Sequence, residues 1–268
     1  MRMINKIYRF INGLLLSNGF EFSKATSPQK VRLLAHQIRP MNTGIELVRI
    51  GGSTDGGYLV PDDFKGISAC YSPGVSDTAN FENELYDKFG IQSHLADYSV
   101  SGPPNDCKPK SFIKKFIGPN TIGDFINLND WIEKCEGNSK SKDSILQMDI
   151  EGGEYLSILA TPREVLLKFR IIVLEVHDVN QWSNRPYFEM VDAFFQKLLQ
   201  DFIVVHLHPN NCCSNVNIGG FVSPKVFEIS FLRKDRINEL NGFAVLPNKL
   251  DGPNVSHKDD LYLSWYKK

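Results

Sequence analysis

Apolar residues along the chain form short runs of strand length that alternate with stretches of helical spacing. The strand-length runs lie at residues 67–72, 91–96, 145–150, 171–176 and 202–207. Between the first two of them, apolar residues from Phe81 to Phe89 recur three and four positions apart, as on one face of a helix. This alternation predicts an α/β protein with a parallel sheet. The run at 225–232 has a period of two and no helix before it, which predicts an antiparallel strand added to that sheet.

The first part of the chain has a different pattern. We expect a helical extension at residues 1–44, followed by one main domain at residues 45–268. Apolar side chains at helical spacing among basic ones predict an amphipathic helix at residues 4–15, and a second helix is expected at 28–38. Polar residues interrupt the first helix, which argues against a signal peptide. Residues 1–22 then contact either the protein's own body or a sister subunit, or else a membrane surface as a peripheral anchor.

One buried strand delivers an acid to the edge of the predicted sheet. The run at 145–150 contains Asp149 near its end and is followed by Glu151, two glycines and Glu154. The glycines permit a sharp turn, and helical spacing begins after them. In open α/β sheets, ligands bind at such strand-to-helix turns. A carboxylate in the first turn of a helix is favoured by the helix dipole, which accounts for Glu154 and leaves Asp149 unexplained.

A second turn of this kind follows the strand expected at residues 67–72. Gly74 lies in that turn, Asp77 is expected to cap the next helix, and Asp97 ends the next strand, 23 residues after Gly74. In this arrangement a nucleotide-type ligand lies on the turn while the acid accepts hydrogen bonds from its ribose hydroxyls. The chain has no GxGxxG pattern here. Its absence counts against a dinucleotide cofactor.

Capping signals predict two further helix starts. Thr121 is followed three residues later by Asp124, and a strand is expected just before it at 112–117. Residues 161–164 have the form of a capping box with proline at the first helical position. We therefore expect a helix after Thr121 and a short helix after residue 162.

Charge and cysteine content exclude several classes of function. Thirty Lys and Arg residues against 31 Asp and Glu residues leave a net charge of −1, without the basic excess that a nucleic-acid partner requires. Five cysteines without a CxxC spacing argue against a zinc knuckle or a disulfide framework, and Cys212 and Cys213 are expected to be free thiols. A reducing, cytoplasmic location is the expectation. No apolar stretch in the sequence reaches the length of a membrane-spanning helix.

The acid-tipped strand carries a resemblance to a known family. Residues 148–154, MDIEGGE, resemble the signature of the FkbM-type methyltransferases, which are S-adenosylmethionine-dependent O-methyltransferases that often act on sugars. Residues 71–77 resemble the first cofactor loop of that family, and 55–58 resemble an upstream element of one branch. Residues 206–211 resemble the end of its sixth strand. Ser76 stands where the family commonly has a glycine.

The resemblance implies a fold and a set of cofactor contacts. The fold is the Rossmann-like class I methyltransferase fold, a seven-stranded, mostly parallel sheet in the order 3-2-1-4-5-7-6. The implied cofactor is S-adenosylmethionine, and the implied acceptor is a sugar or glycan. By this carry-over the cofactor contacts are Gly74, Val75 and Ser76 at the methionine part, Asp97 and its neighbour Tyr98 at the ribose, Asp124 near the adenine, Asp149 at the amino group or the substrate, and Asp55 and Glu82 as further candidates.

Methyl transfer to a hydroxyl requires removal of a proton from that hydroxyl. A histidine base, His177 or His208, can remove it, or a divalent cation can lower the pKa of the hydroxyl. Asp149, Glu175 and His177 follow or end adjacent strands, and they are predicted to share magnesium or manganese. Two alternatives stay open: the histidines are hydrogen-bonded residues without a catalytic part, and Glu175 belongs to a buried salt bridge.

Two functions from other classes also remain. An NAD-dependent oxidoreductase has a similar sheet, and the missing GxGxxG pattern counts against it. A catalytically silent subunit can use this fold to bind a partner through its N-terminal helix, because fold does not determine function. Binding of S-adenosylhomocysteine or of NAD separates the three.

Overall fold

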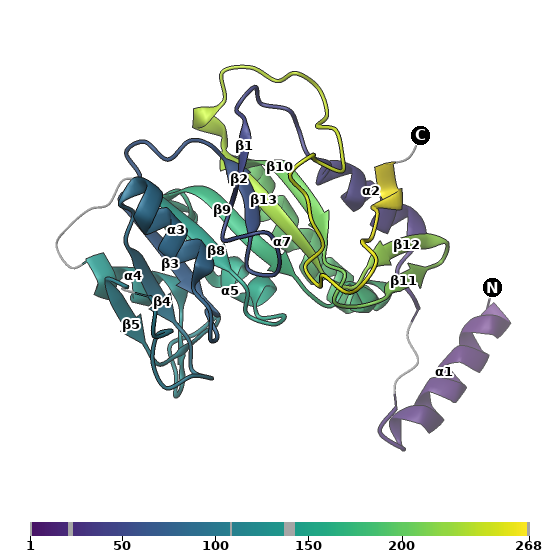
Figure 1. Cartoon of the computed structure of the whole chain (residues 1–268). Helices are drawn as coiled ribbons and strands as arrows, with labels where there is room; N and C mark the ends of the chain where they lie inside the picture. The colour runs from purple at the N-terminus through teal and green to yellow at the C-terminus, as the bar shows by residue number, and fades with distance from the viewer. Residues whose placement is uncertain (1, 21–23, 108, 137–142, 267–268) are drawn as a thin grey trace.

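A sheet with helices on its faces forms the centre of the molecule (Figure 1). The computed structural model describes residues 2–20, 24–107, 109–136 and 143–266. From one edge to the other the strands are β10 (Phe202–Pro209), β13 (Phe227–Arg233), β9 (Phe169–Val176), β8 (Ser144–Met148), β3 (Ala69–Pro73), β4 (Ser93–Ala96) and β5 (Ser111–Ile113). Only β13 is antiparallel to its neighbours, β9 and β10. The predicted α/β class and mostly parallel sheet of seven strands are confirmed.

Three short ribbons lie outside this sheet, and each is a pair of strands. They are β1 (Leu47–Ile50) with β2 (Tyr58–Pro61), β6 (Phe116–Ile117) with β7 (Phe125–Ile126), and β11 (Asn215–Ile218) with β12 (Phe221–Pro224). The labels β1 to β13 count the strands of these ribbons as well. The labels along the central sheet therefore differ from the numbers one to seven used for the expected strand order.

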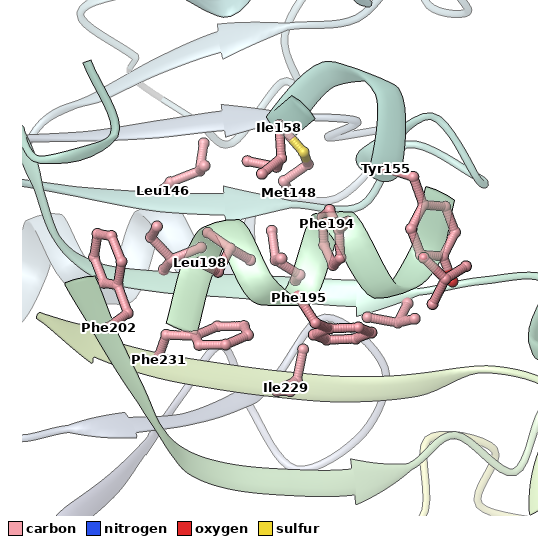
Figure 2. Close-up of a cluster of buried hydrophobic side chains, with 14 of the residues drawn as sticks. Leu146, Met148, Tyr155, Ile158, Phe194, Phe195, Leu198, Phe202, Ile229 and Phe231 are labelled. Carbon is pink, nitrogen blue, oxygen red and sulfur yellow. The ribbon is translucent and has the colours of Figure 1, made fainter. Parts of the chain in front are cut away.

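Both faces of the sheet are buried, which explains why its strands are almost continuously apolar. One face is covered by α7 (Arg185–Asp201) and α5 (Glu154–Ala160), whose aromatic side chains pack on the sheet (Figure 2). On the opposite face α3 (Asn80–Phe89) and the β1–β2 ribbon cover the other side chains of the same strands. Burial of one such aromatic or aliphatic side chain contributes roughly 1.5–3 kcal/mol.

The two predicted N-terminal helices behave differently. The second helix, α2 (Pro28–Gln37), buries Val31 and Leu34 in the same core as the sheet. The first, α1 (Arg2–Leu16), stands apart from the rest of the chain (Figure 1). No helix among the described residues is long and apolar enough to cross a membrane.

The helix predicted to start after Thr121 begins later. It is α4 (Leu128–Glu136), and β7 occupies the preceding residues. The hydroxyl of Thr121 does accept the N–H of Asn127, at 3.1 Å, so it satisfies a backbone donor just ahead of the helix. The strand expected at 112–117 is divided, because Ile113 ends β5 and a second short strand, β6, follows.

Two other capping predictions were wrong. Asp77 does not cap α3, because that helix begins at Asn80. The hydroxyl of Thr161 donates to the carbonyl of Ser157, at 2.7 Å, so it closes the end of α5. The next helix, α6 (Arg163–Leu166), therefore starts without a side-chain cap.

The C-terminal tail lies over the edge of the sheet formed by β10 and β13. The side-chain amide of Asn211 donates to the carbonyls of Val255 and Lys258, at 3.1 and 3.2 Å. Asn254 donates to the buried carboxylate of Glu228. A short 3-10 helix, η3 (Ser264–Tyr266), ends the described tail.

Candidate functional site

Two adjoining hollows form a trough at the carboxyl ends of β3, β4 and β8. They measure about 280 and 330 Å³, and both are lined by Asp55, Gly74, Ser76 and Asp149. The carboxyl ends of parallel strands are the place where ligands bind in open α/β sheets. A trough of this size suits a small organic cofactor or part of its substrate.

The backbones of two strand ends meet at Gly74. Its φ of 84° is left-handed, and a Cβ built on it stands 1.6 Å from the carbonyl oxygen of Asp149. The N–H of Asp149 donates to the carbonyl of Pro73 at 3.3 Å. Only glycine fits here, because any other side chain forces the turn after β3 away from the turn after β8.

Asp97 ties this turn to the end of β4. One of its oxygens accepts the N–H of Ser76 at 2.9 Å, and the other accepts the N–H and the hydroxyl of Ser99, each at 2.7 Å. A carboxylate has about four lone-pair positions, so one remains for a ligand. Ser76 itself has a φ of 50°, a left-handed conformation that explains why glycine is favoured at this position.

Glu154 organises the turn that follows β8. It is fully buried, and its carboxylate accepts the N–H of Ile150 at 2.8 Å and that of Gly152 at 3.0 Å. Glu151 between them has a φ of 56°, and its side chain is 87% exposed. The notion that Glu154 merely adds charge to the first helical turn is therefore incomplete, because its carboxylate fixes the loop that carries Asp149.

His177, directly after β9, lies among three carboxylates. Its Nδ1 is 3.3 Å from Glu154 Oε1. Its Nε2 is 3.4 Å from Glu151 Oε2 and 3.7 Å from Asp149 Oδ1. Burial lowers the pKa of His177, and these carboxylates outweigh that effect and raise it to about 9. At neutral pH the imidazole is therefore protonated on both nitrogens and positively charged. A general base must instead have one nitrogen without a proton.

For Asp149, burial outweighs the nearby charges and determines the direction of the pKa shift. Burial raises its pKa to about 6, against the attraction of His177 and a hydrogen bond with Glu175. Burial also raises the pKa of Glu175 well above its usual range, as does the charge of Asp149. Glu175 is therefore the protonated partner and donates to Asp149, while it accepts from the amide of Asn210 at 2.6 Å. Asp149 is thus ionised at neutral pH and held in place.

The predicted metal ligands are brought together only in part. Atoms of Asp149, Glu151 and His177 lie within 4.8 Å of one another, and Glu151 takes the place expected for Glu175. The two carboxylate oxygens suit magnesium or manganese, whereas an imidazole nitrogen is a more usual ligand of zinc, iron or nickel. Asp149 Oδ1 is buried without a hydrogen-bond partner among the described residues, as a ligand atom awaiting an ion is. The buried salt bridge that the sequence left open for Glu175 is not formed among the described residues, where its partners are Asn210 and Asp149.

His208, the second predicted base, lies outside the trough. It is buried on β10 beside a separate cavity of about 110 Å³ under the tail. Its Nδ1 is 3.7 Å from Asp251, which also stands 2.9 Å from Nε2 of His206. These contacts raise the pKa of His208 in spite of burial, which lowers it. The pair of histidines therefore serves to hold the tail.

The remaining predicted cofactor residues divide between the walls of the trough and its surroundings. Val75 and Glu82 line the first hollow, and burial raises the pKa of Glu82 although it accepts from the hydroxyl of Ser72. Tyr98 and Asp124 line neither hollow. A hydrogen bond between them raises the pKa of Tyr98.

Two polar side chains of the first hollow were not expected from the sequence. Gln147 lies in the middle of β8, where its side-chain oxygen is 2.5 Å from the hydroxyl of Ser72 and its amide donates to the hydroxyl of Tyr58 at 3.4 Å. Both Gln147 and Tyr58 line the hollow. The available signal was Gln147 itself, the one polar residue between Ile145 and Met148.

The contact at Gly74 yields a stability prediction with a matched control. Gly242 has the same φ of 84°, and a Cβ there meets nothing within 4 Å. Gly242→Ala should cost only the left-handed strain, about 1–2 kcal/mol. Gly74→Ala should cost at least about 3 kcal/mol, or prevent folding, because backbone must also move. Urea unfolding measures both, and equal losses would contradict the close approach at Gly74.

The raised pKa of His177 predicts how stability depends on pH. An unfolded histidine titrates near about 6.5, so the stabilisation is complete below that pH and is lost as pH rises through about 9. Across this window we expect a loss on the order of 3 kcal/mol that His177→Gln lacks. Urea unfolding of both proteins at pH 6 and pH 10, with chelator present, measures it. Parallel pH profiles would refute the assignment.

No family model matches the sequence, and no curated protein matches it. The chain is an α/β protein with a mostly parallel sheet of seven strands and an acid-lined trough at the carboxyl ends of its strands.

Proposed function

We propose that this chain is an S-adenosylmethionine-dependent O-methyltransferase that acts on a hydroxyl of a sugar or glycan. The observation that carries the proposal is the trough, where the turn at Gly74 and the acids Asp97 and Asp149 meet. The choice of a sugar acceptor rests on the resemblance of residues 148–154 to the FkbM-type signature.

The arrangement of the sheet supports the proposal. Numbered along the chain within the central sheet alone, its strands run 3-2-1-4-5-7-6 from β5 to β10, and strand 7, which is β13, is the antiparallel one. That is the order expected for a class I methyltransferase. It puts β3 at the position where the strand order reverses, and Gly74 follows β3 directly.

The cofactor would lie along the turn after β3. Gly74, Val75 and Ser76 offer backbone to its methionine part, and Asp97 keeps one lone pair for a ribose hydroxyl. When bound, S-adenosylmethionine supplies an electrophilic methyl group on a sulfonium. Asp55, which lines both hollows, faces this positive charge with a carboxylate.

The acceptor hydroxyl loses its proton to Asp149 in this scheme. A pKa of about 6 leaves that carboxylate ionised at neutral pH and still basic enough to receive a proton. The protonated His177 stabilises it in the charged form, and Glu175 positions it through a hydrogen bond. His177 therefore acts as a positioning residue here, a different role from the base that the sequence suggested.

A divalent cation is compatible with this scheme. Asp149, Glu151 and His177 would hold magnesium or manganese, which lowers the pKa of a bound hydroxyl. His177 must give up its Nε2 proton to bind a metal, whereas Glu154 accepts from its Nδ1 side and fixes the ring.

Calorimetry tests the cofactor assignment. The protein should bind S-adenosylhomocysteine and not NAD, and Asp97→Asn should weaken that binding by about 5- to 150-fold, since a charged acceptor is lost. Asp259→Asn, which changes an exposed acid on the tail, should bind as the wild type does. Binding of NAD would favour an oxidoreductase, and binding of neither would favour a catalytically silent subunit.

Chelation separates a metal mechanism from a metal-free one. If Asp149, Glu151 and His177 hold a cation, chelator should abolish methyl transfer, and magnesium or manganese should restore it. Glu151→Gln should then raise the metal concentration needed for half-maximal activity by about tenfold or more, which Glu133→Gln on α4 should not. Full activity in chelator would leave Asp149 as base without a metal.

A further inference from the structure

Helix α1 presents an apolar face that the rest of the protein does not cover. Of its side chains, Phe10 is 69% exposed, Leu16 57%, Leu14 55%, Ile7 52% and Ile11 45%. Figure 1 shows the helix apart from the sheet and its flanking helices. Among the described residues, these apolar side chains are therefore not packed against the protein's own body, one of the interpretations left open by the sequence.

The apolar residues form one stripe along the helix. Ile7, Phe10, Ile11 and Leu14 are spaced by three and four residues, so they share a face. Lys6 and Arg9 fall outside this stripe, on the polar side. A helix with an apolar face and basic residues on the other is typical of a segment that lies in a membrane interface.

Charge decides between a membrane and a second copy of the chain. Residues 1–20 contain Arg2, Lys6 and Arg9 and no acidic residue, so their formal charge is +3. Two such helices packed together would bring six positive charges into one interface without a counter-charge. The whole chain has a net charge of −1, so the remaining residues total −4 and carry no basic excess to assist a membrane contact. The positive charge is concentrated on α1, where an anionic surface complements it.

We propose that α1 binds to the surface of a bilayer that contains anionic lipids. Its apolar stripe enters the boundary between headgroups and acyl chains, and its basic residues face the headgroup phosphates. At 15 residues the helix is about 22 Å long, too short to span about 30 Å of hydrocarbon, so it lies along the surface. This binding would keep the trough near the membrane, where it could reach hydroxyl-bearing acceptors held at the surface. The binding itself requires no methyl transfer and holds whatever cofactor the trough takes.

Vesicle sedimentation of the full chain tests this assignment. Binding to vesicles of phosphatidylcholine and phosphatidylglycerol at 3:1 should exceed binding to phosphatidylcholine alone by about tenfold or more. Salt at about 0.5 M should remove most of that preference. Phe10→Ser with Leu14→Ser should lower binding to both vesicles at least tenfold, while Lys6→Glu with Arg9→Glu should abolish the anionic preference.

Leu33→Ser is the matched control, because Leu33 is an apolar side chain 60% exposed on α2 and should not affect binding. All of these side chains are exposed, so thermal unfolding should stay unchanged in every variant. Absence of vesicle binding would overturn the proposal, as would equal binding to both compositions. A dimer in lipid-free buffer that Phe10→Ser with Leu14→Ser dissociates, without vesicle binding, would assign the stripe to a sister subunit.

Discussion

The close contact between two backbones at Gly74 is the constraint on which the site depends. The turn after β3 and the turn after β8 approach so closely that a Cβ at Gly74 would overlap the carbonyl oxygen of Asp149. This contact sets the position of Asp149 relative to the turn that carries Ser76. Because Asp97 holds the N–H of Ser76, the end of β4 is tied to the same unit. Three strand ends thus form one rigid wall, and side chains on it keep their relative places.

Electrostatics then distributes the protons of the site. His177 keeps its proton because three carboxylates surround it, whereas Asp149 loses its proton only near neutral pH because it is buried. The two pKa values depend on each other, since the protonated imidazole 3.7 Å from Asp149 limits the rise in the pKa of that carboxyl. Pairs of titratable groups whose environments push their pKa values apart are a mark of acid–base sites. Structural ion pairs shift pKa values too, so the location of this pair in a trough is what favours a chemical role.

Hydrophobic patterning predicted the class of the fold well, whereas local capping signals gave a mixed result. A short helix begins at Arg163 as expected, but α3 begins after Asp77, at Asn80, and the helix expected after Thr121 begins at Leu128. The runs that became β3, β8, β9 and β10 are apolar because both sheet faces are covered, a global property that a single sequence displays directly. Thr121, by contrast, has the residue type of a cap, yet its hydroxyl serves Asn127 at the end of a ribbon. The sequence cannot reveal which nearby donor such a hydroxyl finds, because that depends on packing.

The candidate site residues show the same contrast between what a sequence pattern reveals and what depends on packing. Asp97 and Asp149 were found because an acid at the end of an apolar strand is conspicuous, whereas the exchange of Glu175 for Glu151 depended on side-chain direction. Glu175 is buried inside β9 with Asn210 and Asp149 as its partners, whereas His177 follows the end of that strand, so their nearness in sequence does not bring both to the same ion. The left-handed backbone at Glu151 turns that side chain back toward His177.

Glu175 is buried in the strand and stays protonated. It donates a hydrogen bond to Asp149 and accepts one from the side-chain amide of Asn210. Glu175, which its place in the sequence suggested as a metal ligand, therefore contacts Asp149, the carboxylate that lines the trough. Displacement of Glu175 would change the charge and direction of Asp149, so the interior of β9 and the residue after β10 take part in placing that carboxylate.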